Sequence, residues 1–156
     1  MIVYPSLPSG HTIFCDDVRQ EVSGKQTLVG TYGSAMYVAE FPAILPQISC
    51  VICYREDPES IGSVAIRVIH EVGDDETVMA EIAFDIPEGS KPPAEMEGPF
   101  IMREGKFVVQ LSPFSIEGPG VLKVRAFRDD DEIRLGALKI DLASTMRTED
   151  QAAPPE

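Results

Sequence analysis

Hydrophobic and polar residues alternate at every second position in several separate stretches of this sequence, and turn residues lie between the stretches. The plainest examples are residues 64–70, 78–86 and 121–127. A period of two residues is typical of β-strands with one buried and one exposed face, and no stretch shows the period of a helix. The pattern therefore predicts an all-β chain.

The order of the predicted strands favours two stacked sheets. We expect about eight strands, beginning with a hairpin of residues 11–20 and 27–32 and ending with residues 133–142. Strands at this spacing predict an antiparallel two-sheet β-sandwich of immunoglobulin-like, Greek-key type, with a barrel as the main alternative. In the last strand the hydrophobic positions shift phase at Gly136, which predicts a β-bulge there.

The length of the chain, 156 residues, suits a single domain that needs neither metal ions nor disulfides for stability. We expect the sandwich to occupy residues 1–143 and the polar residues 144–156 to form a disordered C-terminal tail. The proline-rich residues 87–99 are expected to form a loop that crosses from one sheet to the other.

Acidic residues outnumber basic residues by 26 to 13, which gives a net charge of −13 at pH 7. Such a surface repels phosphate backbones and anionic lipids, so we expect neither nucleic acid nor a membrane as partner. The first residues lack the basic and apolar regions of a signal peptide, and no apolar run is long enough to span a bilayer. These features predict a cytoplasmic location.

Three cysteines are too few, and odd in number, for a disulfide framework. Cys50 and Cys53 have the spacing of a metal or redox motif but fall within the predicted strand 47–55. Residues three apart on a strand point to opposite faces, so the two thiols cannot both coordinate one metal ion. We therefore expect ordinary buried thiols, with no metal ion and no other cofactor.

Charged residues gather on one face of the first predicted strand, where Cys15, Asp17, Arg19 and Glu21 occupy alternate positions. Aspartate is disfavoured in strands, so we single out Asp17, Arg19 and Glu21 as a candidate interaction face. The plainest interpretation is a structural ion pair of Arg19 with a carboxylate. A small enzyme that uses Cys15 as nucleophile is a further alternative, although cysteine catalysis normally requires a histidine partner.

Two acidic turns, residues 74–76 and 129–132, suggest a different class of function. Calcium prefers six to eight oxygen ligands, which loops at one end of a sandwich can supply. Neither turn has the spacing of an EF-hand loop, and aspartate is common in turns for conformational reasons. Calcium or carbohydrate binding through such loops is the alternative function.

A set of residues in the first third of the chain resembles the corresponding part of a known protein family. The set resembles the opening of a family of small bacterial proteins known only as a domain of unknown function, and it consists of Phe14-Cys15-Asp16-Asp17-x-Arg19-x-Glu21, Gly24-Lys25, Leu28-x-Gly30-x-Tyr32 and Phe41-Pro42-x-x-Leu45-Pro46. Near the other end, Pro119-Gly120, the alternating Leu122, Val124 and Ala126 and the Asp-rich turn after them are similar to the end of those proteins, so the likeness extends over residues 13–142. It implies a bacterial origin and a compact β domain, and it transfers no catalytic residue.

The chain contains no phosphate-binding glycine loop, no HExxH and no G-x-S-x-G motif. A strand-rich chain without catalytic motifs predicts a non-enzymatic interaction or assembly module. Because exposed strand edges can pair with another chain, we expect a protein partner, which includes a second copy of the chain in a homodimer.

Overall fold

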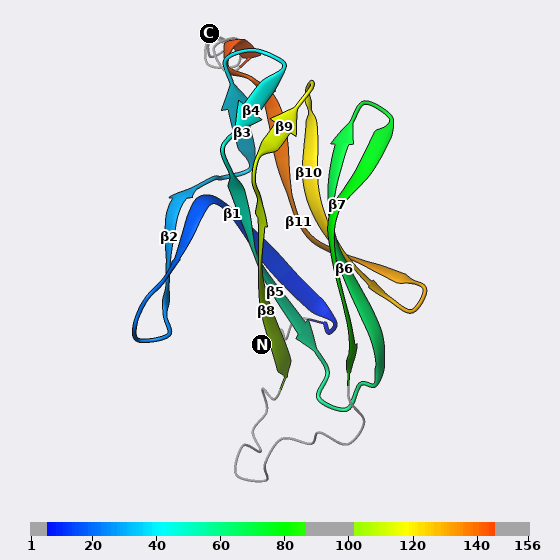
Figure 1. The fold of residues 1–156 in the computed structure, drawn as a ribbon. Coiled ribbons are helices and arrows are strands. Elements are labelled where there is room, and N and C mark those ends of the chain that lie inside the picture. Colours follow the sequence, from blue (N-terminus) through cyan, green and yellow to red (C-terminus); the bar gives the residue numbers. More distant parts are fainter. Residues whose placement is uncertain (1–5, 87–101, 146–156) are drawn as a thin grey trace, which may run out of the picture.

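Figure 1 shows the fold in a computed structural model, which describes residues 6–86 and 102–145 of the chain. Apart from a short helical turn at 143–145, the regular secondary structure of these ranges is all β-strand, as predicted. The strands are β1 (Ser9–Gln20), β2 (Gln26–Thr31), β3 (Ala35–Val38), β4 (Ala43–Leu45), β5 (Ile48–Glu56), β6 (Gly62–Val72), β7 (Asp75–Ile86), β8 (Arg103–Leu111), β9 (Phe114–Ile116), β10 (Gly120–Arg128) and β11 (Asp131–Leu142).

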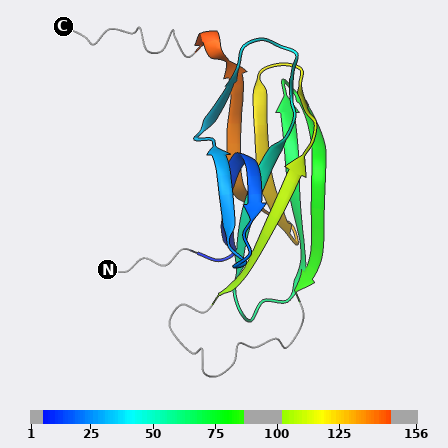
Figure 2. The ribbon, with the colours of Figure 1, turned by 60° about the vertical axis from the view of Figure 1, so that its left-hand side comes forward.

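The strands form two main sheets that stack face to face, which confirms the predicted sandwich (Figure 2). Sheet A has the order β2-β1-β5-β8, sheet B has the order β3-β11-β10-β6-β7, and β4 pairs with β9 in a small separate ribbon. The orders β1-β5-β8 and β11-β10-β6-β7 match the A-B-E and G-F-C-C′ orders of immunoglobulin-like sandwiches. One pair departs from the antiparallel expectation, because β3 runs parallel to β11.

Two of the predicted segments fall mainly outside the described residues. These are the loop 87–99, and the tail 144–156 beyond Thr145. β7, the last strand before residues 87–99, belongs to sheet B, and β8, the first strand after them, belongs to sheet A. No helix within the described ranges has the length and apolar character needed to cross a membrane.

The core lies between the sheets and follows the alternation of the sequence. In β10, Leu122, Val124 and Ala126 are fully buried, while the residues between them face outward. On the side of the sandwich where β7 and β8 lie, the rings of Phe84 and Phe107 stack with their centroids 5.4 Å apart. The aromatic pair therefore connects one edge strand of each sheet.

The predicted β-bulge lies at Gly136, as expected. The register between β10 and β11 shifts between Val124, which faces Gly136, and Arg125, which faces Arg134, so Leu135 is the additional residue. Gly136 has φ +145°, a conformation that favours glycine. A Cβ atom there would lie 3.1 Å from the Cβ of Thr12 on β1. The bulge thus lets β1 pack closely on β11.

The two halves of strand β1 pair with different strands. Its first half, Ser9–Cys15, pairs with β5 inside the sandwich, whereas its second half, from Cys15 to Gln20, pairs with β2. β2 pairs with no strand other than β1 in the described part of the chain, and all its residues except Leu28 are exposed. Residues 16–31, which we call the arm, therefore bend away from the sandwich as a two-stranded ribbon (Figure 1).

Candidate binding groove

The arm leaves the sandwich beyond Cys15, and its residues 24–28 face the outer surface of sheet A across a groove of about 700 Å³. One wall belongs to the arm, at Gly24, Lys25, Gln26 and Leu28. The opposite wall consists of outward-facing residues of β1, β5 and β8, which include His11, Ile13, Val51, Cys53, Arg55, Glu104 and Lys106. The groove thus joins segments that lie far apart in the sequence.

A row of aliphatic side chains crosses the outer face of sheet A at the groove. Ile13 of β1 lies directly opposite Val51 of β5, which in turn lies opposite Val108 of β8. Ile13 is 36% exposed and Val108 is 41% exposed. Ile13 and Val51 of this row line the groove, and Leu28 of the arm adds a further aliphatic group to its wall. The row presents apolar surface from which a partner would gain free energy by excluding water.

The groove carries an excess of positive charge. Its lining includes three cations, Lys25, Arg55 and Lys106, and one carboxylate, Glu104, for a local net charge of +2. Arg55 Nε lies 3.0 Å from Glu104 Oε2, and Lys106 Nζ lies 3.5 Å from Glu104 Oε1. The hydrogen bond from Arg55 lowers the pKa of Glu104. Lys25 has no ion-pair partner among the described residues.

A hydrogen bond and a glycine fix the arm at its base. The Tyr32 hydroxyl donates to Asp16 Oδ1 over 2.6 Å. Asp16 lies directly over Gly30, where Oδ2 is 2.1 Å from the position that a Cβ atom would occupy, and Gly30 has φ +65°. Burial, followed by the bond to Asp16, raises the pKa of Tyr32 to about 12. A larger residue than glycine would displace the Asp16 carboxylate.

A second set of hydrogen bonds ties the base of the arm to the sandwich. Gln47 Nε2 donates to Asp17 Oδ1 and to the Asp16 carbonyl oxygen, each over 3.0 Å. Gln110 Nε2 of β8 donates to Gln47 Oε1 over 2.6 Å. The Asp17 carboxylate also accepts the Val18 amide over 2.9 Å. The direction in which the arm leaves the sandwich is therefore set by side chains from three segments.

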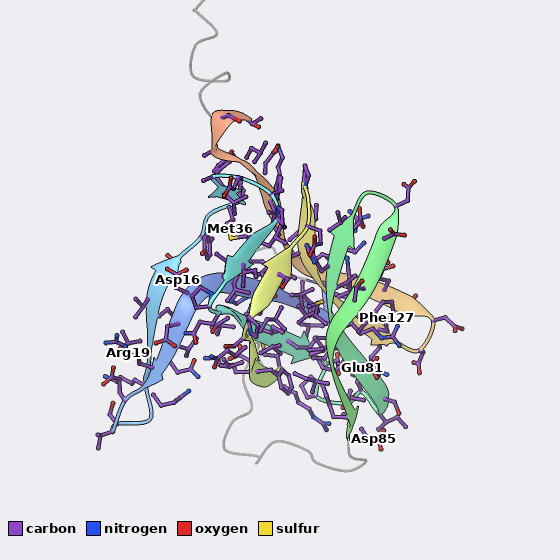
Figure 3. All side chains as sticks on the ribbon, turned by 45° about the horizontal axis from the view of Figure 1, so that its top comes forward. Asp16, Arg19, Met36, Glu81, Asp85 and Phe127 are labelled. Carbon is purple, nitrogen blue, oxygen red and sulfur yellow. The ribbon has the colours of Figure 1, made fainter. Side chains whose placement is uncertain are left out.

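The residues of the predicted interaction face, Asp17, Arg19 and Glu21, all lie on the arm, but none of them lines the groove. Arg19 Nε lies 3.8 Å from Asp17 Oδ2, and Glu21 Oε1 accepts a hydrogen bond from the Thr27 hydroxyl over 2.6 Å. Figure 3 shows Asp16 at the base of the arm and Arg19 further along it. Their role as an interaction face stays a prediction.

Comparison with known protein families adds one finding. The sequence model of a family described as a family of unknown function, DUF6941, matches residues 11–141. The chain belongs to this family. No curated protein matches the sequence. The DUF6941 region spans the whole arm and the groove, and its description attributes no activity to either.

The cysteines of this DUF6941 chain lack the properties of a nucleophile. Cys15 is completely buried, and burial, together with the charges of Asp16 and Asp17, raises its pKa. Burial raises the pKa of Cys50 to about 12. A reactive cysteine needs access and a lowered pKa, so the geometry argues against an enzyme that uses Cys15. Cys50 lies in the core and Cys53 lines the groove, on opposite faces of β5 as expected.

The two acidic turns do not combine into one site. Val72 of β6 pairs with Gly120, whereas Val64 pairs with Arg128. The turn that follows Val72 and the turn that follows Arg128 therefore lie at opposite ends of sheet B, about 27 Å apart at a strand rise of about 3.4 Å per residue. No group of three or more histidine, cysteine or acidic side chains within 6–86 and 102–145 is arranged to hold a metal ion.

A smaller hollow of about 460 Å³ lies on the outer face of sheet B, where Phe127, Ala65 and Ala83 face solvent side by side. The Arg67 guanidinium stands 4.7 Å from the centroid of the Phe127 ring and pairs with Glu81 over 2.5 Å. Figure 3 shows Phe127 and Glu81 on this sheet, away from the arm. Because Arg67 already covers the ring, this hollow offers less free apolar surface than the groove.

Sequence reasoning missed a buried polar cluster between the sheets. Glu56 is 3% exposed, and its Oε2 accepts hydrogen bonds from the Tyr54 hydroxyl over 2.5 Å and from Arg128 Nε over 2.8 Å. Arg128 also donates to the Ile61 carbonyl over 2.7 Å. The only signal in the sequence is the spacing of Tyr54 and Glu56, which places both on the core face of one strand.

Proposed function

We propose that the chain is a non-enzymatic protein-binding module that holds an extended segment of a partner protein in the groove between the arm and sheet A. The observation that carries this proposal is the arm itself. A ribbon that is exposed on nearly all its residues gains little stability from burial, yet hydrogen bonds at its base hold it over an aliphatic row. This arrangement is typical of a binding surface rather than of a folding element.

The chemistry of the groove indicates which segments fit. Aliphatic side chains of a bound segment would cover Ile13 and Val51, and each fully buried one contributes about 1.5–3 kcal/mol. Carboxylates of the segment would approach Lys25 and Lys106, which the net charge of +2 favours. An extended segment presents alternate residues to one side, so an acidic residue two positions from an aliphatic residue matches this surface.

The high negative charge of the whole chain supports a protein partner over nucleic acid or an anionic membrane, since both would be repelled outside the groove. A cytoplasmic location stays part of the proposal, as does the absence of any cofactor. A second copy of the chain is included among the protein partners.

Selection from a random peptide library displayed on phage tests the proposal. The immobilised full chain should enrich peptides that combine aliphatic and acidic residues, and these peptides should bind with micromolar dissociation constants in calorimetry. Lys106→Glu, which changes an amine that is 67% exposed, should weaken their binding at least tenfold. Arg134→Glu is the matched control, because Arg134 is exposed on β11 of sheet B.

Two results would overturn the proposal. The first is that no peptide is enriched on the wild-type chain relative to the Lys106→Glu variant. The second is that the enriched peptides bind the Lys106→Glu variant as tightly as the wild type, which would place their site elsewhere on the molecule. Melting curves of both variants should agree with that of the wild type within a few degrees, so that a loss of binding is not a loss of folding.

A further inference from the structure

The tip of the arm presents an unusual combination of groups to solvent. Val22 is 110% exposed relative to its reference value, so it contacts neither the groove nor the sandwich of its own chain. Its neighbour Glu21 is also exposed. Turn residues are normally small or polar, so the fully exposed valine at this hairpin tip presents apolar surface that no described residue of its own chain covers.

The backbone holds the tip in a defined shape. The Glu21 amide donates to the Lys25 carbonyl over 2.8 Å, and the Gly24 amide donates to the Glu21 carbonyl over 3.0 Å. Gly24 has φ +81°, which permits the tight turn. Because both ends of the turn are hydrogen-bonded, Val22 is presented in a fixed position and little conformational entropy is lost when it is covered.

The tip and the groove are complementary in chemistry. The tip offers Val22 and the Glu21 carboxylate, neither of which lines the groove of its own chain, whereas Lys25 of the same turn does. The groove offers an aliphatic row together with an excess of two positive charges. Since Val22 does not reach the groove of its own chain, these two surfaces can meet only between different molecules.

We propose that the occupant of the groove is the arm tip of a second copy of this chain, and that the two copies exchange arms around a two-fold axis. This inference rests on the proposed function, because it names the partner of the same groove. In a two-fold dimer each chain supplies one tip and one groove, so both contacts are identical and no groove is left open. Val22 lies against the aliphatic row of the partner, and Glu21 lies near the cations that flank it.

Mutual repulsion of the two acidic chains does not prevent this contact. Each chain has a net charge of −13, but charges more than about 8 Å apart are largely screened at physiological ionic strength. The Glu21 carboxylate and the cations of the partner's groove meet at shorter range, where screening is weaker. The dimer is therefore expected to be one of moderate affinity, with a dissociation constant in the micromolar range.

Sedimentation velocity of the full chain over a range of concentrations, up to about 1 mM, tests the arm exchange with a reciprocal pair of charge reversals. The wild type should dimerise. Glu21→Lys and Lys106→Glu should each raise the dimer dissociation constant at least tenfold, because each places like charges in both contacts. Val22→Ser should have a similar effect without loss of folding, since the valine is fully exposed.

A mixture of the two charge-reversal variants gives the decisive result. In the mixed dimer, the reversed tip of one chain meets the reversed groove of the other, and the second contact is unchanged from the wild type. Dimerisation should therefore return in the mixture. Arg134→Glu, on sheet B, should dimerise as the wild type does.

A wild-type chain that is monomeric throughout, or a dimer that neither charge reversal weakens, would overturn the arm exchange. Failure of the mixture to restore association would do the same. The peptide selection described above distinguishes these results from a failure of the groove: if peptides still bind in the groove of a monomeric chain, the protein-binding function stands and only the second copy is excluded as its occupant.

Discussion

The buried cluster of Tyr54, Glu56 and Arg128 gives a sharp test of how the two sheets are joined. Replacing Arg128 by methionine keeps most of the side-chain volume and removes the guanidinium that lies 2.8 Å from the carboxylate of Glu56. The carboxylate of Glu56, which is 3% exposed, would keep its hydrogen bond from the Tyr54 hydroxyl but would have no positive charge beside it. Breaking a buried ion pair on one side typically costs about 3–5 kcal/mol.

This cost is a large part of the stability of a typical domain, which is about 5–15 kcal/mol. At about 2–4 °C per kcal/mol for a chain of this size, the melting temperature should fall by roughly 6–20 °C. Urea unfolding followed by far-ultraviolet circular dichroism gives the free energy directly. Tyrosine fluorescence provides a second probe, because the chain has four tyrosines and no tryptophan.

A second variant separates loss of the cation from loss of packing. The double variant Glu56→Gln with Arg128→Met has no buried charge, so it should be more stable than Arg128→Met alone by about 1–3 kcal/mol. A cost below about 1 kcal/mol for Arg128→Met, or a double variant that is less stable than the single one, would contradict a stabilising role for the buried ion pair.

Two further predictions concern the arm and a buried histidine. Gly30→Ala should destabilise the chain by about 2–3 kcal/mol and speed amide hydrogen exchange at Leu28, because φ is +65° and the new Cβ would displace Asp16 from Tyr32. Gly24→Ala is the control, because φ is +81° there and, its chain neighbours apart, no described atom lies within 4 Å of the new Cβ. This change should lower the free energy of unfolding only by the backbone strain of about 1 kcal/mol. Equal effects of the two changes would contradict the proposed role of Asp16. His70 is 8% exposed, and its Nε2 has no hydrogen-bond partner among the residues that the structure describes. Burial lowers the pKa of His70, so the unfolded state binds a proton more readily and stability should fall as the pH drops from about 7 to 5. His70→Leu should flatten this pH dependence in urea unfolding, and an unchanged slope would show that another group causes it.

Local pattern was sufficient for the parts of the fold that depend on neighbouring residues. The alternation in residues 121–127 predicts β10 because each residue of a strand faces opposite to the next. The phase shift at Gly136 predicts the bulge for the same reason, since an additional residue reverses the faces beyond it. The opposite faces of Cys50 and Cys53 follow from their spacing alone.

The groove could not be predicted in this way, because it depends on which strands pair. In β1 the apolar run Ile13-Phe14-Cys15 is followed by Asp16-Asp17, which marks an irregularity, but the local sequence does not show that the strand leaves β5 there and pairs with β2 alone. The aliphatic row joins Ile13, Val51 and Val108, which become neighbours only through pairing with β5 and β8. The bond between Glu56 and Arg128 likewise joins residues 72 positions apart.

Several of the residues that carry the family resemblance belong to the arm or to the groove. Asp16, Gly30 and Tyr32 form the base of the arm, and Lys25 and Leu28 line the groove. Hydrogen bonds at exposed sites contribute only about 0.5–1.5 kcal/mol each to stability, so a core of similar size would stabilise the chain more. These residues fix the direction of a ribbon that buries almost none of its own surface, and the proposed binding of another chain against the arm requires this fixed direction.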